Sequence, residues 1–215
     1  MDEEKWAAAV SAAELVEDGM AVGLGTGSTV AYLLPALAAR RLDIRCVATS
    51  IGTEEDAAAA GLRVEPFDRL DRLDIAIDGA DQVDGTGWLV KGGGGAHTRE
   101  KIVAAAAARF VVIVSPDKLV ESVRPPVPLE LLPFGLATTL RRLGAAKVRP
   151  DTPPSPDGGI IADWLDPFDD ASALSTYLQS VPGVVDHGLF DPALAGQVIV
   201  GRSSPPPGRA PSPDS

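Results

Sequence analysis

In its first half, the chain alternates short apolar segments with alanine-rich segments of high helix propensity. Strands that alternate with helices along a chain favour a mostly parallel sheet with helices on both faces. We therefore predict an α/β domain of this kind. The expected helices are 3–18, 30–39, 54–60 and 98–108, and the expected strands are 20–24, 44–48, 63–67, 74–78, 88–91 and 110–114.

The pattern changes near Val123, after which prolines and short strand-like segments punctuate the chain. From there the order of elements is strand, helix, strand, strand, helix, strand, which is typical of a small α+β domain of the ferredoxin-like kind. The predicted elements are strands 128–132, 146–149 and 159–164, a helix at about 169–180 and the segment 181–187.

These patterns predict two domains and a tail. A final apolar strand at 197–200 is expected to return to the first domain, which would then comprise residues 1–124 and 196–202. Residues 125–195 would form the smaller domain. The Pro/Ser-rich residues 203–215 are expected to be disordered, because such a composition buries little apolar surface.

Charge and composition narrow the classes of function. The net charge of −11 and the lack of a basic stretch argue against a nucleic-acid partner. No apolar run reaches the roughly 18 residues that a membrane span needs, and the acidic start Met-Asp-Glu-Glu does not suit a secretory signal. A cytoplasmic protein without a membrane partner is expected. The single cysteine, Cys46, excludes an internal disulfide and a thiol-rich zinc site, and we expect it to be buried.

A glycine-rich loop, GLGTGST at 23–29, joins the first strand to the second helix. It departs from a dinucleotide fingerprint, because Ser28 stands where the third glycine should be, and it lacks the lysine of a P-loop. Backbone N–H groups at a helix N-terminus attract phosphate, and the hydroxyls of Thr26 and Thr29 suit a phosphate or a sugar. A tight turn with Ser/Thr capping is an equally good interpretation of this loop alone.

Two carboxylates, Asp78 and Asp81, follow the apolar strand 74–77. In open parallel sheets, ligands bind beyond the carboxyl ends of the strands, so these carboxylates could bind sugar hydroxyls or move a proton. Turn and capping chemistry is the alternative. A metal site is not expected, because the spacing matches no EF-hand loop and no histidine or cysteine joins the acids. Residues 84–87 are predicted to form a hairpin turn.

Lys91 stands before four consecutive glycines, and Glu100 follows shortly after them. We expect Thr98 to cap the helix that begins there. A carboxylate, a lysine and backbone N–H groups together suit proton transfer next to a carbonyl, because the cations and N–H groups stabilise the developing oxyanion. The alternative is a flexible loop with Glu100 as a favourable helix-dipole charge. We expect His97 to be a solvated loop residue and assign no role to His187.

In this order, the motifs closely resemble those of the type A ribose-5-phosphate isomerases. The resemblance covers nearly the whole chain except the tail. The matching segments are GLGTGST (23–29), ATSIGT (48–53), DIAIDGAD (74–81), LVKGGGGAHTREKIV (89–103), VVIVSPDKLV (111–120), VPLELLPFG (127–135) and VPGVVDHGLF (181–190).

The resemblance implies an enzyme that interconverts D-ribose 5-phosphate and D-ribulose 5-phosphate through an enediolate, a step of the non-oxidative pentose phosphate pathway. It further implies no metal or organic cofactor, a Rossmann-like domain with an inserted ferredoxin-like domain, and a homodimer or homotetramer to which the smaller domain could contribute contacts. A catalytically silent sugar-phosphate-binding protein is the alternative, against which intact Lys91 and Glu100 argue.

The resemblance also implies roles for single residues. Glu100 would accept the proton, and Lys91 would contact the reacting end of the sugar. Asp78 and Asp81 would bind the sugar and assist ring opening, and Lys118 would contact the substrate near its phosphate. The other substrate-binding positions would be Lys5, which can reach the phosphate, and Thr26, Gly27, Ser28, Thr29, Gly79, Ala80, Gly92, Gly93 and Gly94.

The chain departs from the family pattern in its second half. Asp157-Gly-Gly-Ile160 replaces a DNGN-like turn, and residues 149–156 are unusually rich in proline. We expect neither departure to touch the active site.

Overall fold

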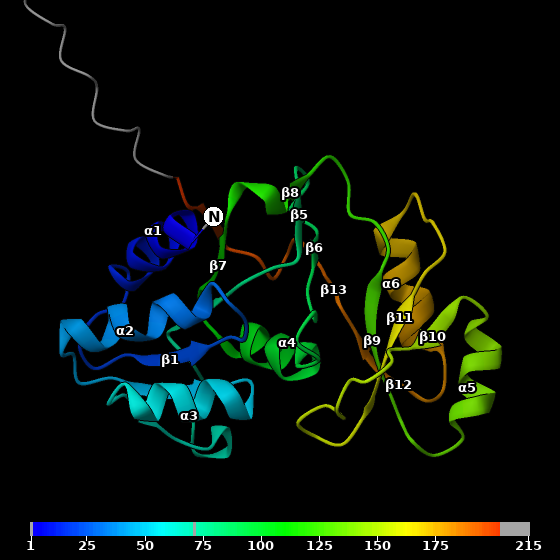
Figure 1. The fold of residues 1–215 in the computed structure, drawn as a ribbon, viewed down its shortest axis with the longest axis horizontal. Coiled ribbons are helices and arrows are strands. Elements are labelled where there is room, and N and C mark those ends of the chain that lie inside the picture. Colours follow the sequence, from blue (N-terminus) through cyan, green and yellow to red (C-terminus); the bar gives the residue numbers. More distant parts are fainter. Residues whose placement is uncertain (1, 71, 203–215) are drawn as a thin grey trace, which may run out of the picture.

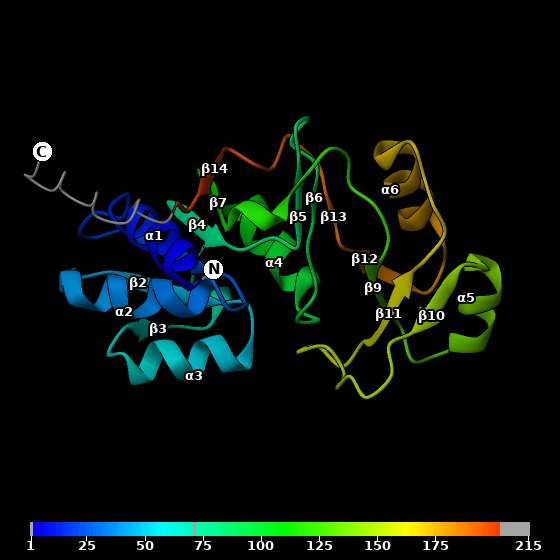
Figure 2. The ribbon, with the colours of Figure 1, turned by 45° about the horizontal axis from the view of Figure 1, so that its top comes forward.

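Three β-sheets organise the chain in the computed structural model, which describes residues 2–70 and 72–202 (Figures 1 and 2). A six-stranded sheet and a four-stranded sheet lie at opposite ends of the molecule, with a second four-stranded sheet between them (Figure 1). The predicted disordered tail, residues 203–215, lies outside the described residues.

The six-stranded sheet has the order β14-β7-β4-β1-β2-β3, and every neighbouring pair is parallel. This is the doubly wound order of a Rossmann-like sheet, in which the chain runs outward from β1 first in one direction and then in the other. The predicted parallel α/β sheet is therefore confirmed. The strands are β1 (Ala21–Leu24), β2 (Arg45–Ala48), β3 (Arg63–Val64), β4 (Ile75–Asp78), β7 (Phe110–Val114) and β14 (Gln197–Val200).

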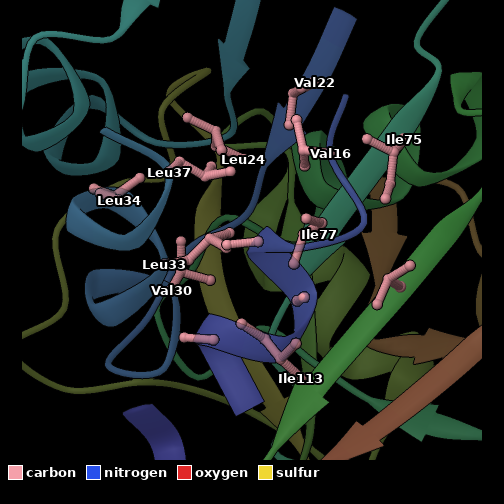
Figure 3. Close-up of a cluster of buried hydrophobic side chains, with 14 of the residues drawn as sticks. Val16, Val22, Leu24, Val30, Leu33, Leu34, Leu37, Ile75, Ile77 and Ile113 are labelled. Atoms are coloured by element: carbon pink, nitrogen blue, oxygen red, sulfur yellow. The ribbon is translucent and has the colours of Figure 1, made fainter. Parts of the chain in front are cut away.

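Helices pack on both faces of this sheet because alternate strand residues point to opposite sides. Ile75 and Ile77 of β4 join the cluster that contains buried residues of α1 and α2 (Figure 3), whereas Ala76 joins the cluster of α4. The helices are α1 (Asp2–Ala13), α2 (Val30–Arg40), α3 (Ile51–Ala59) and α4 (His97–Ala106), with short 3₁₀ helices at Phe67–Arg69 and Pro116–Lys118.

The outer four-stranded sheet is antiparallel with the order β10-β11-β9-β12. Its chain order of strand, helix, strand, strand, helix, strand is that of a ferredoxin-like unit, as predicted. Leu143, Leu174 and Leu178 of its two helices pack on its strands in one apolar cluster. The elements are β9 (Val127–Leu131), α5 (Leu136–Leu143), β10 (Ala146–Val148), β11 (Ile160–Trp164), α6 (Ala171–Ser180) and β12 (Val184–His187).

The middle sheet, β13-β6-β5-β8, was not predicted as a sheet. Its β5–β6 hairpin confirms the predicted turn at 84–87, while the other strands are only two residues long and give no periodic signal. β13, which follows the ferredoxin-like unit, pairs with β6 of the first half. The strands are β5 (Gln82–Asp84), β6 (Leu89–Val90), β8 (Leu119–Val120) and β13 (Leu189–Phe190).

Two smaller expectations can be compared with the described residues. Cys46 is fully buried, as predicted, and burial raises the pKa of its thiol to about 12. None of the helices described within 2–70 and 72–202 has the length and apolar character to span a bilayer.

Truncation of a core side chain should destabilise the larger sheet. Ile113 of β7 is fully buried in the first cluster, so Ile113→Ala should lower the free energy of unfolding by about 2–5 kcal/mol. Ile102→Ala is the matched control, because Ile102 is 53% exposed and its loss should change stability by about 0.5 kcal/mol or less. Urea titration of both variants compares them, and equal losses would contradict this assignment of the core.

Candidate functional site

The site lies where the strand order of the six-stranded sheet reverses, between the carboxyl ends of β1 and β4. Ligands of doubly wound sheets bind in the crevice at this switch point. The loop after β1 and the loop after β4 meet there, because the N–H of Thr26 donates to Oδ1 of Asp78 over 3.1 Å. The two motifs GLGTGST and DGAD are therefore brought together by sheet topology.

A pocket at this point is lined entirely by residues that the sequence predicted for substrate binding or catalysis. Two further predicted residues lie against it. Asp78 is buried in contact with Lys91, and Lys5 of α1 donates to Oγ of Ser28 over 3.0 Å. The lining residues are Thr26, Gly27, Ser28, Thr29, Gly79, Ala80, Asp81, Lys91, Gly92, Gly93, Gly94, Glu100 and Lys118.

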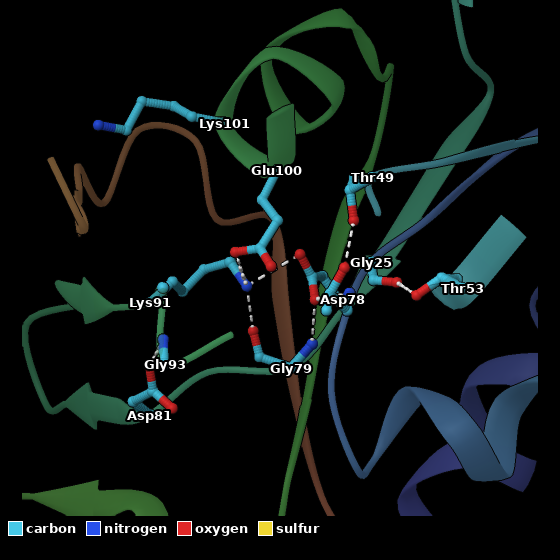
Figure 4. Close-up of polar contacts among 12 residues, drawn as sticks. Gly25, Thr49, Thr53, Asp78, Gly79, Asp81, Lys91, Gly93, Glu100 and Lys101 are labelled. Atoms are coloured by element: carbon cyan, nitrogen blue, oxygen red, sulfur yellow. Dashed lines mark hydrogen bonds and ion pairs between the residues drawn. The ribbon is translucent and has the colours of Figure 1, made fainter. Parts of the chain in front are cut away.

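Lys91, which lines the pocket, lies between the carboxylates of Asp78 and Glu100 (Figure 4). Its Nζ is 2.9 Å from Oδ2 of Asp78 and 3.1 Å from Oε2 of Glu100, and it also donates to the carbonyl oxygen of Gly79. All three charged side chains are at most 4% exposed. Because an unpaired charge is very unfavourable at this depth, the three groups must stay together.

Burial shifts the proton affinities of this group. Burial and the negative charge of Asp78 both raise the pKa of Glu100 and Lys91 lowers it, so that the pKa lies at about 8. Burial also raises the pKa of Asp78, and the two carboxylates together raise that of Lys91. Lys91 therefore stays protonated, while Glu100 can bind and release a proton close to neutral pH.

The segment before β13 packs against the backbone of Lys91. The N–H of Lys91 donates to the carbonyl oxygen of Gly188 over 2.9 Å. A Cβ on Gly188 would lie 2.1 Å from the carbonyl oxygen of Lys91, so only glycine permits this approach. The buried ring of Phe190 has its centroid 5.4 Å from Nζ of Lys91, a cation–π distance.

The glycines after Lys91 form a tight turn against Asp81. Gly92 and Gly95 have φ angles of +105° and +74°, and the N–H of Gly95 donates to the carbonyl of Gly92. The N–H of Gly93 donates to Oδ2 of Asp81 over 2.8 Å, and a Cβ on Gly93 would lie 2.8 Å from Oδ1. This N–H, which we had expected to face an anionic ligand, therefore already has a carboxylate partner.

The loop after β1 is held by threonines of the ATSIGT segment. Oγ1 of Thr49 lies 2.8 Å from Oγ1 of Thr26, and Oγ1 of Thr53 donates to the carbonyl of Gly25 over 2.9 Å. A Cβ on Gly25 would overlap the carboxylate of Asp78, which explains the glycine there. Thr49 and Thr53 are buried, and no role was predicted for either of them. The sequence feature that could have indicated such a role is the run of small hydroxyl residues directly after β2.

Capping does not explain the hydroxyl groups of the GTGST loop. Thr29 is the N-cap residue of α2, yet its side chain makes no capping hydrogen bond. Ser28 instead accepts from Lys5. True capping occurs at α3, where Oγ of Ser50 accepts from the N–H of Thr53. The hydroxyls of Ser28 and Thr29 therefore remain available to the pocket that they line.

Two predictions about α4 were wrong. His97 is fully buried rather than solvated, and burial lowers its pKa to about 3. Gly92 lies against its ring, since a Cβ on Gly92 would be 2.7 Å from its Nδ1, and strands β9 and β12 of the outer sheet contact its helix. Thr98 does not cap α4, whose N-cap residue is Ala96, because its hydroxyl donates to Glu130 of β9.

The proline-rich segment touches the site, contrary to our expectation. Its first residue, Arg149, follows β10 and donates to the carbonyl oxygens of Gly92 and Gly93 over 3.3 and 3.0 Å. The turn that replaces the DNGN-like sequence also reaches the larger domain, because Asp157 pairs with Arg99 of α4. Sequence alone gave no reason for either contact.

Proteins of one known family share this sequence pattern. The family model of ribose 5-phosphate isomerase A (phosphoriboisomerase A) matches residues 45–204. A ribose-5-phosphate isomerase A of Rhodopseudomonas palustris strain TIE-1 is 44% identical, with 94% of this chain and 96% of that protein covered.

Solved structures agree with this match. The structure of ribose 5 phosphate isomerase A from Neisseria gonorrhoeae has a TM-score of 0.89 at 32% identity, covering 94% of this chain and 93% of that one. A D-ribose-5-phosphate isomerase in complex with phospho-erythronic acid has a TM-score of 0.83 at 33% identity, covering 90% and 93%. From the matched family model, the identity over nearly the full length and the shared fold, this chain belongs to the ribose 5-phosphate isomerase A family.

Proposed function

We infer that the protein interconverts D-ribose 5-phosphate and D-ribulose 5-phosphate by moving a proton between two neighbouring carbons. The observation that carries this function is the buried contact of Lys91 with Glu100 at the base of the pocket, in a chain of this family. The relative that was solved with phospho-erythronic acid supports a phosphorylated sugar-like ligand.

We assign the proton transfer to Glu100. In the direction from aldose to ketose, its carboxylate removes the proton from C2, and the electron pair forms the C1–C2 double bond while O1 becomes negative. The ammonium of Lys91 stabilises that oxyanion. Glu100 then returns its proton to C1, the proton of the C2 hydroxyl passes to O1, and C2 becomes the ketone. Overall no atom or electron is gained or lost.

We assign the rest of the pocket to binding. Asp81 lines the pocket and would bind sugar hydroxyls and assist ring opening, while Asp78 would act mainly through Lys91, which it contacts. The phosphate would lie at the N-terminus of α2, where free N–H groups and the helix dipole favour an anion. The cations and hydroxyls that would bind it are those of Ser28, Thr29 and Lys118, which line the pocket, and of Lys5, which donates to Ser28.

We further propose that the enzyme acts in the cytoplasm, in the non-oxidative pentose phosphate pathway, and as a homodimer or homotetramer. The division into residues 1–124 plus 196–202 and residues 125–195 remains our proposal. The exposed side chains of Leu132 and Phe134, which are 49% and 92% accessible, support self-association through the smaller domain.

Removal of the base should abolish turnover and spare binding. In Glu100→Gln the shape is kept but the carboxylate is lost, so kcat should fall by at least about 10²-fold. Ribose 5-phosphate binding, measured by calorimetry, should stay within a few fold. Glu55→Gln, on the exposed face of α3, is the matched control and should be unchanged. Near-normal turnover of Glu100→Gln would refute the assignment of the base.

The rate should depend on pH through the pKa of Glu100. Because the base works only when ionised and its pKa is about 8, kcat should rise with pH across a limb centred near pH 8. Asp78→Asn removes a negative charge that raises this pKa and leaves Glu100 as the charged partner of Lys91. The rise of its residual activity with pH should therefore be centred at a lower pH than in the wild type. A flat profile from pH 6.5 to 9 in the wild type would contradict the shift.

Loss of the lysine should affect the chemical step. Lys91→Met removes the oxyanion donor, so kcat should fall by a factor on the order of 10² or more. Lys118→Met is the comparison, because Lys118 lines the same pocket but contacts neither Asp78 nor Glu100, and its loss should act mainly on KM. Steady-state kinetics separate the two, and a Lys91→Met effect confined to KM would mean ground-state binding only.

A further inference from the structure

Arg149 of the smaller domain joins the glycine loop to a carboxylate of its own sheet. Its Nε and Nη2 donate to the two oxygens of Asp163 on β11, over 3.0 and 2.6 Å. Its third nitrogen, Nη1, donates to the carbonyl oxygens of Gly93 and Gly92, over 3.0 and 3.3 Å. The side chains of Arg149 and Asp163 are 20% and 17% exposed, and the hydrogen bond to Gly93 lies nearer the surface than the other three.

The hydrogen bond from Arg149 to Gly92 binds the Gly92–Gly93 peptide unit, whose other side contacts Asp81. The carbonyl of Gly92 and the N–H of Gly93 belong to one planar peptide unit and point in opposite directions. Arg149 binds the carbonyl side of this unit, and Asp81 accepts from its N–H side over 2.8 Å. The orientation of this peptide therefore fixes where the carboxylate of Asp81 lies.

The loop needs an external support because its residues have no side chains. Glycine has more backbone freedom than any other residue, and four follow one another directly after Lys91. A guanidinium has five donors in a rigid plane. Its pairing with Asp163 fixes that plane and leaves Nη1 directed at the loop. An ammonium group has no such fixed geometry.

We propose that Arg149, held by Asp163, is a positioning residue that sets the Gly92–Gly93 peptide and thereby aligns Asp81 and Lys91 for isomerisation. The inference rests on the proposed function. It makes the smaller domain part of the catalytic machinery, although that domain supplies none of the residues that line the pocket.

A purely structural ion pair between the two domains is the alternative, and the chain contains a control for it. Arg99 of α4 pairs with Asp157 of the smaller domain through Nε and Nη2, over 2.8 and 2.6 Å. This pair also bridges the two parts of the chain through a two-pronged contact. Its hydrogen bonds reach Asp157 and the carbonyl of Pro156 but no glycine of the loop.

The experiment compares Arg149→Met with Arg99→Met in the full-length chain. Arg149→Met should lower kcat by 10- to 10²-fold, as a displacement of about 1 Å in a catalytic group can, while Arg99→Met stays within about twofold of the wild type. Arg149→Lys should recover little of the loss, because lysine keeps the charge but not the fork. Equal effects of the two methionine variants, or full recovery with lysine, would overturn the proposal.

Two further measurements keep the test independent of folding and of the assigned reaction. Asp163→Asn should lower kcat in the same direction, and the double variant with Arg149→Met should lose no more than the single one, because both act on one contact. Amide hydrogen exchange in residues 92–96 should quicken in Arg149→Met and not in Arg99→Met. Unchanged exchange would refute the positioning role, whereas a wild type that fails to convert ribose 5-phosphate would refute the proposed function alone.

Discussion

The buried contact of Lys91 with Asp78 and Glu100 is the interaction on which the rest of the site depends. One cation and two carboxylates are withdrawn from water, and this arrangement is tolerable only while all three stay together. The same withdrawal raises the pKa of Glu100 to the range where a carboxylate exchanges protons near neutral pH. Burial thus has two effects here, since it demands close packing around the charges and it raises the pKa of Glu100.

Much of the surrounding structure keeps these charges in place. Glycines stand where a side chain would displace a charged group or its backbone, at Gly25 against Asp78 and at Gly188 against Lys91. The buried hydroxyls of Thr49 and Thr53 hold the loop that covers Asp78. The chain as a whole is strongly acidic, so the attraction of an anionic substrate depends on this small number of local cations and N–H groups.

The residues that line the pocket come in contiguous motifs, and for this reason the family resemblance could point to them from the sequence. The order of the parallel strands brings together the loops that carry Thr26 and Asp81, and the β5–β6 hairpin returns the chain to Lys91 beside them. Prediction from the sequence failed where packing brings together segments that are distant in the chain. The burial of His97 and the contact of Arg149 with Gly93 both depend on how the outer four-stranded sheet lies against the glycine loop. No local sequence pattern encodes this arrangement. The two-residue strands β8 and β13 were missed because they are too short to give a periodic signal.

The pairing of β6 has a consequence for how the enzyme is made. Lys91 follows directly on β6, whose neighbours are β5, a few residues earlier, and β13, about a hundred residues later. During synthesis from the N-terminus, the strand that precedes Lys91 stays unpaired on one side until the whole ferredoxin-like unit has emerged. Contacts of such long sequence separation form late. Lys91 should therefore be among the last groups to reach its final position, so that incomplete chains carry the motifs without the site.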